Sequence, residues 1–568
     1  MLAFALTIRV WAALDARDAP FWRIPSLDEK AFLELAQAMR AGIAPPHGAF
    51  FIAPGYAYVL TAIGAAGGGL LAAKLLNLAA GAASAVLVMH LARCTASRRA
   101  ALAAGLAWAA YSSALLQELL ISKSALATLA MLGSAVAFAP SRADPPRAMR
   151  WAAGGALLGF GVLLRPEWMI ACAVLFASAL LARRRGWPGA PPWRALAAAA
   201  APIALVVAVP TSQNFARTGD WVPIAYGSGS NFYIGNHAGA HGGYVPLRPD
   251  RSEPAYEETD ANLLAQRDAG RTLGPSAVSR FWWRRGFEWW QRRPVDALRL
   301  TAKKWALLWG PRELADGLST RLAARWIAPL GITSAAPSLL LPAALDGLWI
   351  LRRRRDLWPH FALVAGMQAA IVPFFLFERF RLSLVAMSVP FAAAAVEAVW
   401  RGLRARAWRR TGIGVGLTGA LACGLAVPRI PVDENALRAH LGGLFFEAKR
   451  YDEALREFEI VRAALPDAWR VEINVANTHA ARGDHAAAAA AIERALVRLH
   501  AEAEHTGIPS TEELAYCHEL AGELARVLGR REDASHHFTA ALSFAAPPDR
   551  ARIQARLEAL RPAAATPP

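Results

Sequence analysis

Two adjacent acidic residues, Asp28 and Glu29, are the side chains of this 568-residue sequence whose surroundings best suit proton transfer. They begin a stretch that ends at Gly42 and whose apolar residues follow the spacing of a helix lying along a surface. A carboxylate at a lipid surface, beside a water-filled cleft, can accept a proton from an attacking hydroxyl group. A structural role competes, because Ser26 and Glu29 have the spacing of a capping box and Asp28 favours the helix dipole. Both acids are therefore candidate catalytic residues.

Four basic residues form a second set of candidates, because guanidinium and ammonium groups bind phosphate through charge-assisted hydrogen bonds. They are Lys123, Arg165, Arg379 and Arg381. Each stands near the end of an apolar stretch, so snorkelling towards lipid headgroups is the competing explanation. A phosphate that leaves at a membrane surface gathers negative charge and needs fixed cations of this kind. We therefore expect these four residues to bind substrate.

A third set of candidate substrate-binding residues, Asn231, Tyr233 and Asn236, lies in a stretch rich in glycine and asparagine. Their side chains can hydrogen-bond the hydroxyl groups of a sugar while the glycines keep the backbone close. Turn formation competes, since Asn and Gly favour turns whatever they bind. The sequence shows no metal-ligand spacing and no glycine-rich loop that would cradle a nucleotide phosphate. We expect no metal site and no resident cofactor, with a divalent metal left open.

Apolar helices must position these side chains. The apolar stretches that are long enough, or nearly so, to cross a bilayer are residues 1–14, 70–92, 100–117, 122–139, 151–165, 168–182, 195–212, 327–350, 360–377, 381–400 and 411–428. Several are shorter than the ~20 residues that a perpendicular helix needs. The sequence therefore predicts a mainly α fold, in which residues 1–430 form a polytopic membrane bundle of about eleven helices.

Arginine is concentrated in alternate loops between these stretches. The arginine-rich loops are residues 93–99, 142–150, 183–194, 352–355 and 401–410. By the positive-inside rule these loops face the cytoplasm, and the loops 15–69 and 213–325 lie on the outer face together with the candidate residues. In a bacterium this is the periplasmic face of the inner membrane. The net charge of +18 is then explained by topology and by contact with membrane lipids, and no basic motif indicates nucleic acid.

The charged, alanine-rich tail, residues 434–568, has an internal repeat. Ala454, Phe458 and Val461 recur 34 positions later as Ala488, Ile492 and Ala495, which is the period of tetratricopeptide helix pairs. An odd number of spans places this second domain on the outer face. Such arrays present concave surfaces, so a protein partner or acceptor is expected to dock there, with a plain spacer as the alternative.

The order of several short motifs resembles one enzyme family. The motifs are Leu27-Asp28-Glu29 with Phe32, Ala53-Pro54-Gly55-Tyr56, Leu119 to Ser124, Leu164-Arg165-Pro166, Gly229 to Asn236 and Phe377 to Leu382. Together they resemble glycosyltransferase family 39 of the glycosyltransferase C superfamily, the protein O-mannosyltransferase and aminoarabinose transferase-like enzymes. A bacterial subgroup of these also ends in tetratricopeptide repeats. One departure is Ser383, where many relatives have proline.

The resemblance implies a membrane enzyme that transfers a hexosyl or pentosyl group from a polyprenyl-phosphate donor to a periplasmic protein, lipid or glycan. It makes Asp28 the general base. Two alternatives stay open: a periplasmic polysaccharide ligase or polymerase, and a non-enzymatic transporter or assembly scaffold with partner docking on the repeats. A ligase would not predict the Asp-Glu pair in the first outer loop, and a transporter would show ionisable residues along a path through its spans.

Overall fold

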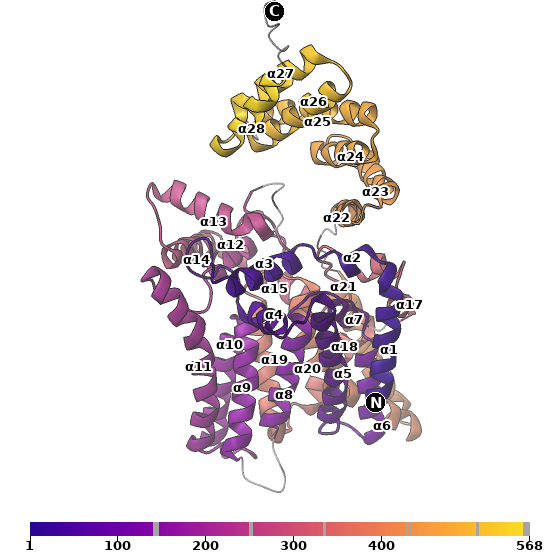
Figure 1. Cartoon of the computed structure of the whole chain (residues 1–568). Coiled ribbons are helices and arrows are strands. Elements are labelled where there is room, and N and C mark those ends of the chain that lie inside the picture. Colours follow the sequence, from indigo (N-terminus) through magenta and orange to yellow (C-terminus); the bar gives the residue numbers. More distant parts are fainter. Residues whose placement is uncertain are drawn as a thin grey trace, which may run out of the picture. The chain divides into compact units, whose positions relative to one another are not determined.

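The chain is built from helices that form two compact units, Met1–Val432 and Asp433–Pro568. The structure, a computed structural model, describes residues 1–139, 147–248, 251, 254–332, 337–427, 430, 434–506 and 511–560 (Figure 1). The mainly α fold class predicted from the sequence is confirmed.

The first unit opens with helices that coincide with the predicted apolar stretches and with four elements that lie in the predicted loop 15–69. These are α1 (Leu2–Asp15), η1 (Ala16–Asp18), α2 (Pro20–Arg23), α3 (Asp28–Arg40), α4 (Gly55–Ala65), α5 (Leu70–Ala92), α6 (Arg98–Ala109), α7 (Ser112–Leu119), α8 (Ser124–Phe138), α9 (Ala148–Leu164), α10 (Trp168–Arg184) and α11 (Trp193–Thr218). The long loop predicted over residues 213–325 folds into α12 (Ser228–Gly235), α13 (Pro254–Ala269), α14 (Pro275–Arg292), α15 (Pro294–Trp309) and α16 (Thr320–Ala323).

The remaining elements of the first unit follow α16 along the chain. Its elements are α17 (Ala328–Ile332), α18 (Pro337–Leu351), η2 (Arg355–Leu357), α19 (Trp358–Ile371), α20 (Glu378–Arg404) and α21 (Trp408–Ala426). Helices pack closely where glycine faces backbone: a Cβ atom on Gly347 of α18 would overlap the carbonyl of Phe391 in α20. In the same way, Gly155 of α9 lies against Ala199 of α11. Small residues at such crossings let apolar helices approach without a driving force from water.

Among the described residues, three helices, α5, α11 and α20, are by themselves long and apolar enough to cross a membrane. The pair α6 and α7 adds a fourth span if the 47° bend between them is a break within one crossing. Other helices coincide with predicted spans but are shorter than a bilayer is thick. The count of eleven spans is therefore not confirmed, and it stays a prediction.

A buried ion pair joins two helices of the bundle. Arg9 of α1 lies 2.7 Å, Nε to Oε2, from Glu118 of α7, and the two side chains are 1% and 3% exposed. The carboxylate packs directly on Gly81 of α5, where a Cβ atom would leave it no room. Two buried charges are tolerated when each is the other's partner. The pair fixes α7, and with it the segment 120–123 that reaches the candidate site.

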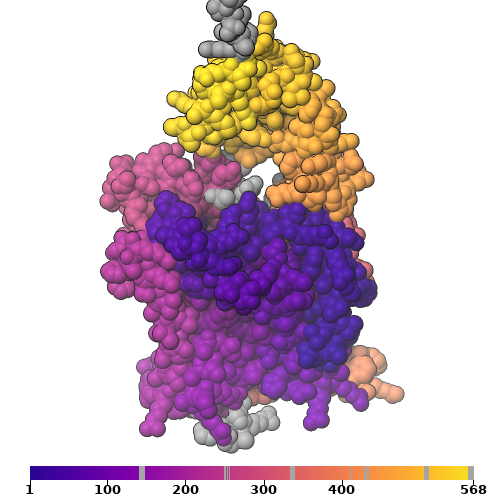
Figure 2. Space-filling model, in the orientation of Figure 1, coloured from indigo at the N-terminus to yellow at the C-terminus, as the bar shows by residue number. Residues whose placement is uncertain are grey.

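Residues 15–69 cover part of the first unit. Figure 2 shows the N-terminal part of the chain in indigo, spread as a continuous surface on this side of the molecule. Helix α3 packs on α4 and is in turn contacted by α13 of the long loop. The tryptophan-rich helix α14 ends at Arg292, just before Pro294, as its sequence predicts. The long loop therefore folds over the start of the first outer loop.

The second unit consists of α22 (Glu434–Glu447), α23 (Tyr451–Ala464), α24 (Trp469–Arg482), α25 (His485–Thr506), α26 (Thr511–Val527), α27 (Arg531–Phe544) and α28 (Pro547–Glu558). Each helix packs on the next along the chain. The repeated residues Ala454 and Ala488 are fully buried, as close helix pairing requires. The tetratricopeptide assignment itself stays a prediction.

A chain truncated after Val432 should still fold and accumulate in the membrane fraction, because the second unit has its own core. Size-exclusion elution and thermal unfolding of the detergent-extracted protein would be compared with those of the full chain. Loss of the truncated protein from membranes, at equal transcript level, would show that residues 433–568 are part of the bundle's folding unit.

Candidate active site

Asp28 stands at the first turn of α3, directly after a strained residue. Leu27 has a φ of 48° and a ψ of −126°, a conformation that non-glycine residues adopt rarely and at a cost of ~1–3 kcal/mol. Glu29 holds this turn in place, because its carboxylate accepts hydrogen bonds from the backbone N–H groups of Ser26, at 3.2 Å, and Ile121. Half of the predicted capping box is thus present. Glu29 is 7% exposed and ties the start of α3 to the segment after α7.

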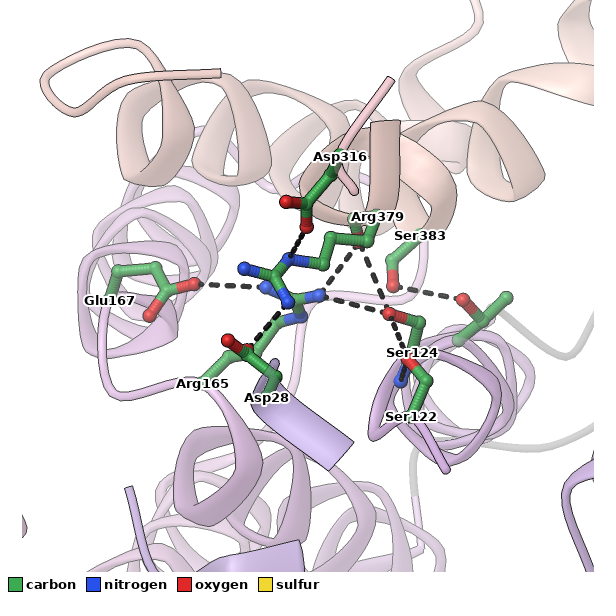
Figure 3. Close-up of polar contacts among 9 residues, drawn as sticks. Asp28, Ser122, Ser124, Arg165, Glu167, Asp316, Arg379 and Ser383 are labelled. Atoms are coloured by element: carbon green, nitrogen blue, oxygen red, sulfur yellow. Dashed lines mark hydrogen bonds and ion pairs between the residues drawn. The ribbon is translucent and has the colours of Figure 1, made fainter. Parts of the chain in front are cut away.

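Arg379 is the centre of the site. Its Nη1 atom lies 2.5 Å from Oδ2 of Asp28, and its Nε atom lies 2.8 Å from Oδ2 of Asp316 (Figure 3). The guanidinium thus bridges α3, the segment between α15 and α16, and the first turn of α20. All three side chains are partly exposed, at 17%, 31% and 19% for Arg379, Asp28 and Asp316. A ligand can therefore reach this cluster.

Arg165 follows α9 and packs beside Arg379. Its Nη2 atom donates to the carbonyl of Arg379 at 2.7 Å and to Ser124 Oγ at 3.3 Å, and Nη1 lies 3.6 Å from Oε1 of Glu167 (Figure 3). The guanidinium also lies over the ring of Phe380, 5.1 Å from its centroid. The Nε atom is buried and has no hydrogen-bond partner among the described residues. One donor of Arg165 is thus uncommitted.

Lys123 is a second uncommitted donor. Its Nζ atom lies 5.3 Å from the ring centroid of Phe32, and no described residue forms a hydrogen bond or ion pair with it. The charged groups that act on it are Arg165, Asp28, Glu167 and Arg379. Residues far apart in the sequence thus place an acid and three cations together. The structure brings together Asp28, Lys123, Arg165 and Arg379 from the predicted set.

Two further acids lie beside the cluster, and no sequence motif identified either of them as a candidate residue. Asp316 contacts Arg379, and Glu257 of α13 is hydrogen-bonded to Tyr244 and acts electrostatically on Asp28. Burial raises the pKa of Asp316 to about 6, with Arg379 opposing and Asp28 adding to the shift. Burial and the charge of Asp28 raise the pKa of Glu257 to about 7. The cluster therefore includes acids that carry a proton over part of the neutral pH range.

Arg381 belongs to a separate, fully buried network. It is 0% exposed, and its Nε atom donates to Glu378 at 2.8 Å while Nη1 and Nη2 donate to the carbonyls of Gly310 and Arg312 at 2.8 and 2.6 Å. Tyr111 donates to the other oxygen of Glu378 at 3.1 Å. In this arrangement Arg381 anchors the segment that carries Asp316.

The three predicted sugar-binding residues lie on or beside α12. Asn236 is 1% exposed, and its Oδ1 accepts from Trp290 Nε1 at 3.0 Å and from Lys304 Nζ at 3.3 Å. Tyr233 stacks on His237, and Asn231 is half-buried. None of the hydrogen bonds described for these three residues joins them to the Arg379 cluster. In the described part of the chain, no group of three or more His, Cys, Asp or Glu side chains has the geometry to hold a metal ion.

Among known proteins, the chain is similar in structure to several solved structures. No family model and no curated protein match the chain. The oligosaccharyltransferase of Archaeoglobus fulgidus in its apo form has a TM-score of 0.38 and 15% identity, over 79% of this chain and 59% of the archaeal one. Its complex with Zn and sulfate has a TM-score of 0.41 and 15% identity, over 80% and 56%. This chain thus matches less than two thirds of the archaeal protein's length, and likeness at this level establishes neither family nor function.

Raising the pH should loosen α13 from α3 through Glu257. Its pKa of about 7 in the folded chain exceeds the ordinary 4.5, so the folded state holds the proton more tightly and the contact weakens as pH rises from 4.5 towards 7. We expect hydrogen-exchange protection of α13, corrected for intrinsic rates, to fall over this range in the parent and to stay level in Glu257→Gln. Glu288→Gln on α14, at a half-exposed surface ion pair, is the matched control. An unchanged pH dependence in Glu257→Gln would assign the effect to another group.

Proposed function

We propose that this protein is a membrane glycosyltransferase that moves a sugar from a polyprenyl-phosphate donor to an acceptor hydroxyl, with Asp28 as general base. The observation that carries the proposal is the placement of Asp28 among Arg379, Arg165 and Lys123, with Lys123 Nζ and Arg165 Nε free of described hydrogen-bond partners. Arg165 Nε is buried and Lys123 is half-buried, so an unmet donor costs free energy, most of all at Arg165, and a phosphate would satisfy both.

The proposed transfer is balanced by groups in this cluster. The bond between the sugar's anomeric carbon and the phosphate oxygen breaks, and a bond from that carbon to the acceptor oxygen forms. Asp28 takes the acceptor's proton, while Lys123, Arg165 and Arg379 offset the charge that gathers on the leaving phosphate. The proposal gives no role to a cofactor.

Donor binding would also prepare the base. Without donor, Oδ2 of Asp28 lies 2.5 Å from Arg379 Nη1, so the guanidinium occupies that oxygen and keeps it from an acceptor hydroxyl group. A phosphate competes with Asp28 for that same nitrogen. Since Arg379 keeps its contact with Asp316, the phosphate can replace Asp28 without leaving the guanidinium unpaired. The carboxylate then becomes available when the substrate is present.

Other predicted residues take supporting roles in the proposal. Glu29 and Arg381 position the turn of Asp28 and the segment of Asp316 through their backbone hydrogen bonds. The half-buried Asn231 and Tyr233 are the proposed contacts to sugar hydroxyls, and Asn236 supports them. A protein partner or acceptor would dock on the second unit.

Asp28→Asn should lower sugar transfer by ~100-fold or more, because the amide keeps the size of the side chain but cannot take the proton. Donor binding should persist or tighten, since Arg379 is released, whereas Lys123→Met should weaken it. Transfer and donor binding would be measured on purified variants at equal protein levels. Glu34→Gln, an exposed acid on the same helix, is the control. Parent-rate transfer by Asp28→Asn would reduce Asp28 to a structural partner of Arg379.

We also propose that the site and the second unit lie on the outer, periplasmic face of a bacterial inner membrane. A reporter enzyme that works only outside the cytoplasm should be active when fused after Val432, because the arginine-rich loops hold the opposite ends of the helices inside. A cytoplasm-specific reporter at the same position is the control. Activity of the cytoplasmic reporter alone would invert the topology and separate the site from an outer acceptor.

A further inference from the structure

A second group of hydrogen-bond donors, one lysine and two histidines, lies at the end of α12, outside the Arg379 cluster. Lys304 of α15 is 0% exposed, and its Nζ atom donates to Asn236 Oδ1 at 3.3 Å and to the carbonyl of Pro373 at 3.4 Å. Both acceptors are neutral and both contacts are long. A buried ammonium with neutral acceptors only is weakly compensated.

Two half-buried imidazoles share this corner, and the backbone sets the tautomer of each. The N–H of Gly239 donates to His237 Nδ1 at 3.1 Å, and the N–H of Gly243 donates to His241 Nδ1 at 3.3 Å. In a neutral ring whose Nδ1 accepts, the proton is on Nε2. Each histidine therefore presents an Nε2–H donor, and no described residue accepts from either.

The charges of this corner act on one another without a carboxylate between them. Burial, His241 and Lys304 lower the pKa of His237, and burial and Lys303 lower the pKa of His241. Burial lowers the pKa of Lys304 to about 7. No acidic side chain is among the groups that shift these three described residues. The corner thus offers hydrogen-bond donors and positive charge, and it lacks an anion.

The backbone holds these donors in place. Gly242 has a φ of 104°, and a Cβ atom there would lie 3.0 Å from Leu307 Cδ1 and 3.7 Å from Lys304 Cγ, so only glycine lets the loop lie on α15. The carbonyl of Gly242 accepts from the N–H of Leu376 at 2.9 Å. The corner is therefore fixed to the segment that leads into Arg379, but it uses different donors.

We propose that His237, His241 and Lys304 form a second anion subsite, which takes a phosphate-type oxyanion. Its oxygens accept from the two Nε2–H groups and from the Lys304 ammonium, and its negative charge is the counter-charge that Lys304 lacks. The group is either a soluble phosphate ester or a lipid headgroup. The subsite does not depend on the proposed transfer reaction.

The test is binding of inorganic phosphate to the full chain in a neutral detergent, measured by calorimetry. We expect two sites for each chain. Lys304→Met and His241→Gln should each weaken one of them by ~10-fold or more, as loss of a charge-assisted hydrogen bond does, and Lys123→Met should weaken only the other. Lys449→Met in the second unit is the matched control.

The affinity of this second site for phosphate should fall as pH rises above about 7, because Lys304 of the ligand-free protein has a pKa of about 7 and loses its proton above that pH. Lys304→Met should remove this pH dependence. If Lys304→Met does not fold, His241→Gln decides alone, because that side chain is half-buried. Parent affinity at both sites in His241→Gln overturns the subsite. A single site that only Lys123→Met weakens also overturns it and leaves the proposed function standing.

Nanodiscs distinguish the two sources of the phosphate group. In discs of phosphatidylcholine alone the parent should bind inorganic phosphate at both sites. If adding phosphatidylglycerol removes binding at the Lys304 site only, a lipid headgroup occupies it. If binding there is unchanged, the ligand is a soluble phosphate ester. Each result supports the subsite and identifies its source.

Discussion

The ion pairs of Arg379 are the interaction on which the rest of the site depends. Arg379 lies in the first turn of α20. Its guanidinium forms ion pairs with Asp28, near the start of the chain, and with Asp316, between α15 and α16. Removing one partner from a largely buried pair leaves the other charge uncompensated, so these segments must be held together. Glu29 and Arg381 do this through backbone hydrogen bonds on either side. The arrangement is rigid except where a competing anion can displace Asp28.

Arginines and lysines on this face of the bundle differ in how fully they are used. Arg165 and Arg381 donate to backbone carbonyls, as a planar fork with five donors allows. Lys123 and Lys304 have few or weak described contacts, and each is a compact charge on a long stem. Arg165 and Arg381 therefore position the chain, although Arg165 Nε has no hydrogen-bond partner among the described residues. The two proposed anion contacts would use that nitrogen, Arg379 and the two lysines.

Much of the fold could be predicted from hydropathy. The apolar stretch 70–92 coincides with α5, because Gly69 and Arg93 bound a run that is mostly apolar and contains no proline. The lengths of the helices were harder to predict. Several apolar stretches form helices that are too short to cross a bilayer alone, because proline and glycine end them early.

The site was predicted in part, for reasons that particular residues make clear. Asp28, Arg165 and Arg379 carry local motifs, and these residues do meet. Asp316, between α15 and α16, and Glu257, on α13, belong to no local motif, and only tertiary structure brings them to the Arg379 cluster. Arg379 and Arg381 are two positions apart on one helix, so their side chains point to nearly opposite faces and cannot share one ligand.

The most direct measurement is a cryo-EM structure of the full chain in a lipid nanodisc with a bound polyprenyl phosphate. We expect the phosphate within hydrogen-bond distance of Lys123 Nζ and the Arg165 guanidinium, with Arg379 Nη1 moved from Asp28 to a phosphate oxygen. A phosphate bound elsewhere, with the pair between Asp28 and Arg379 intact, would contradict this expectation.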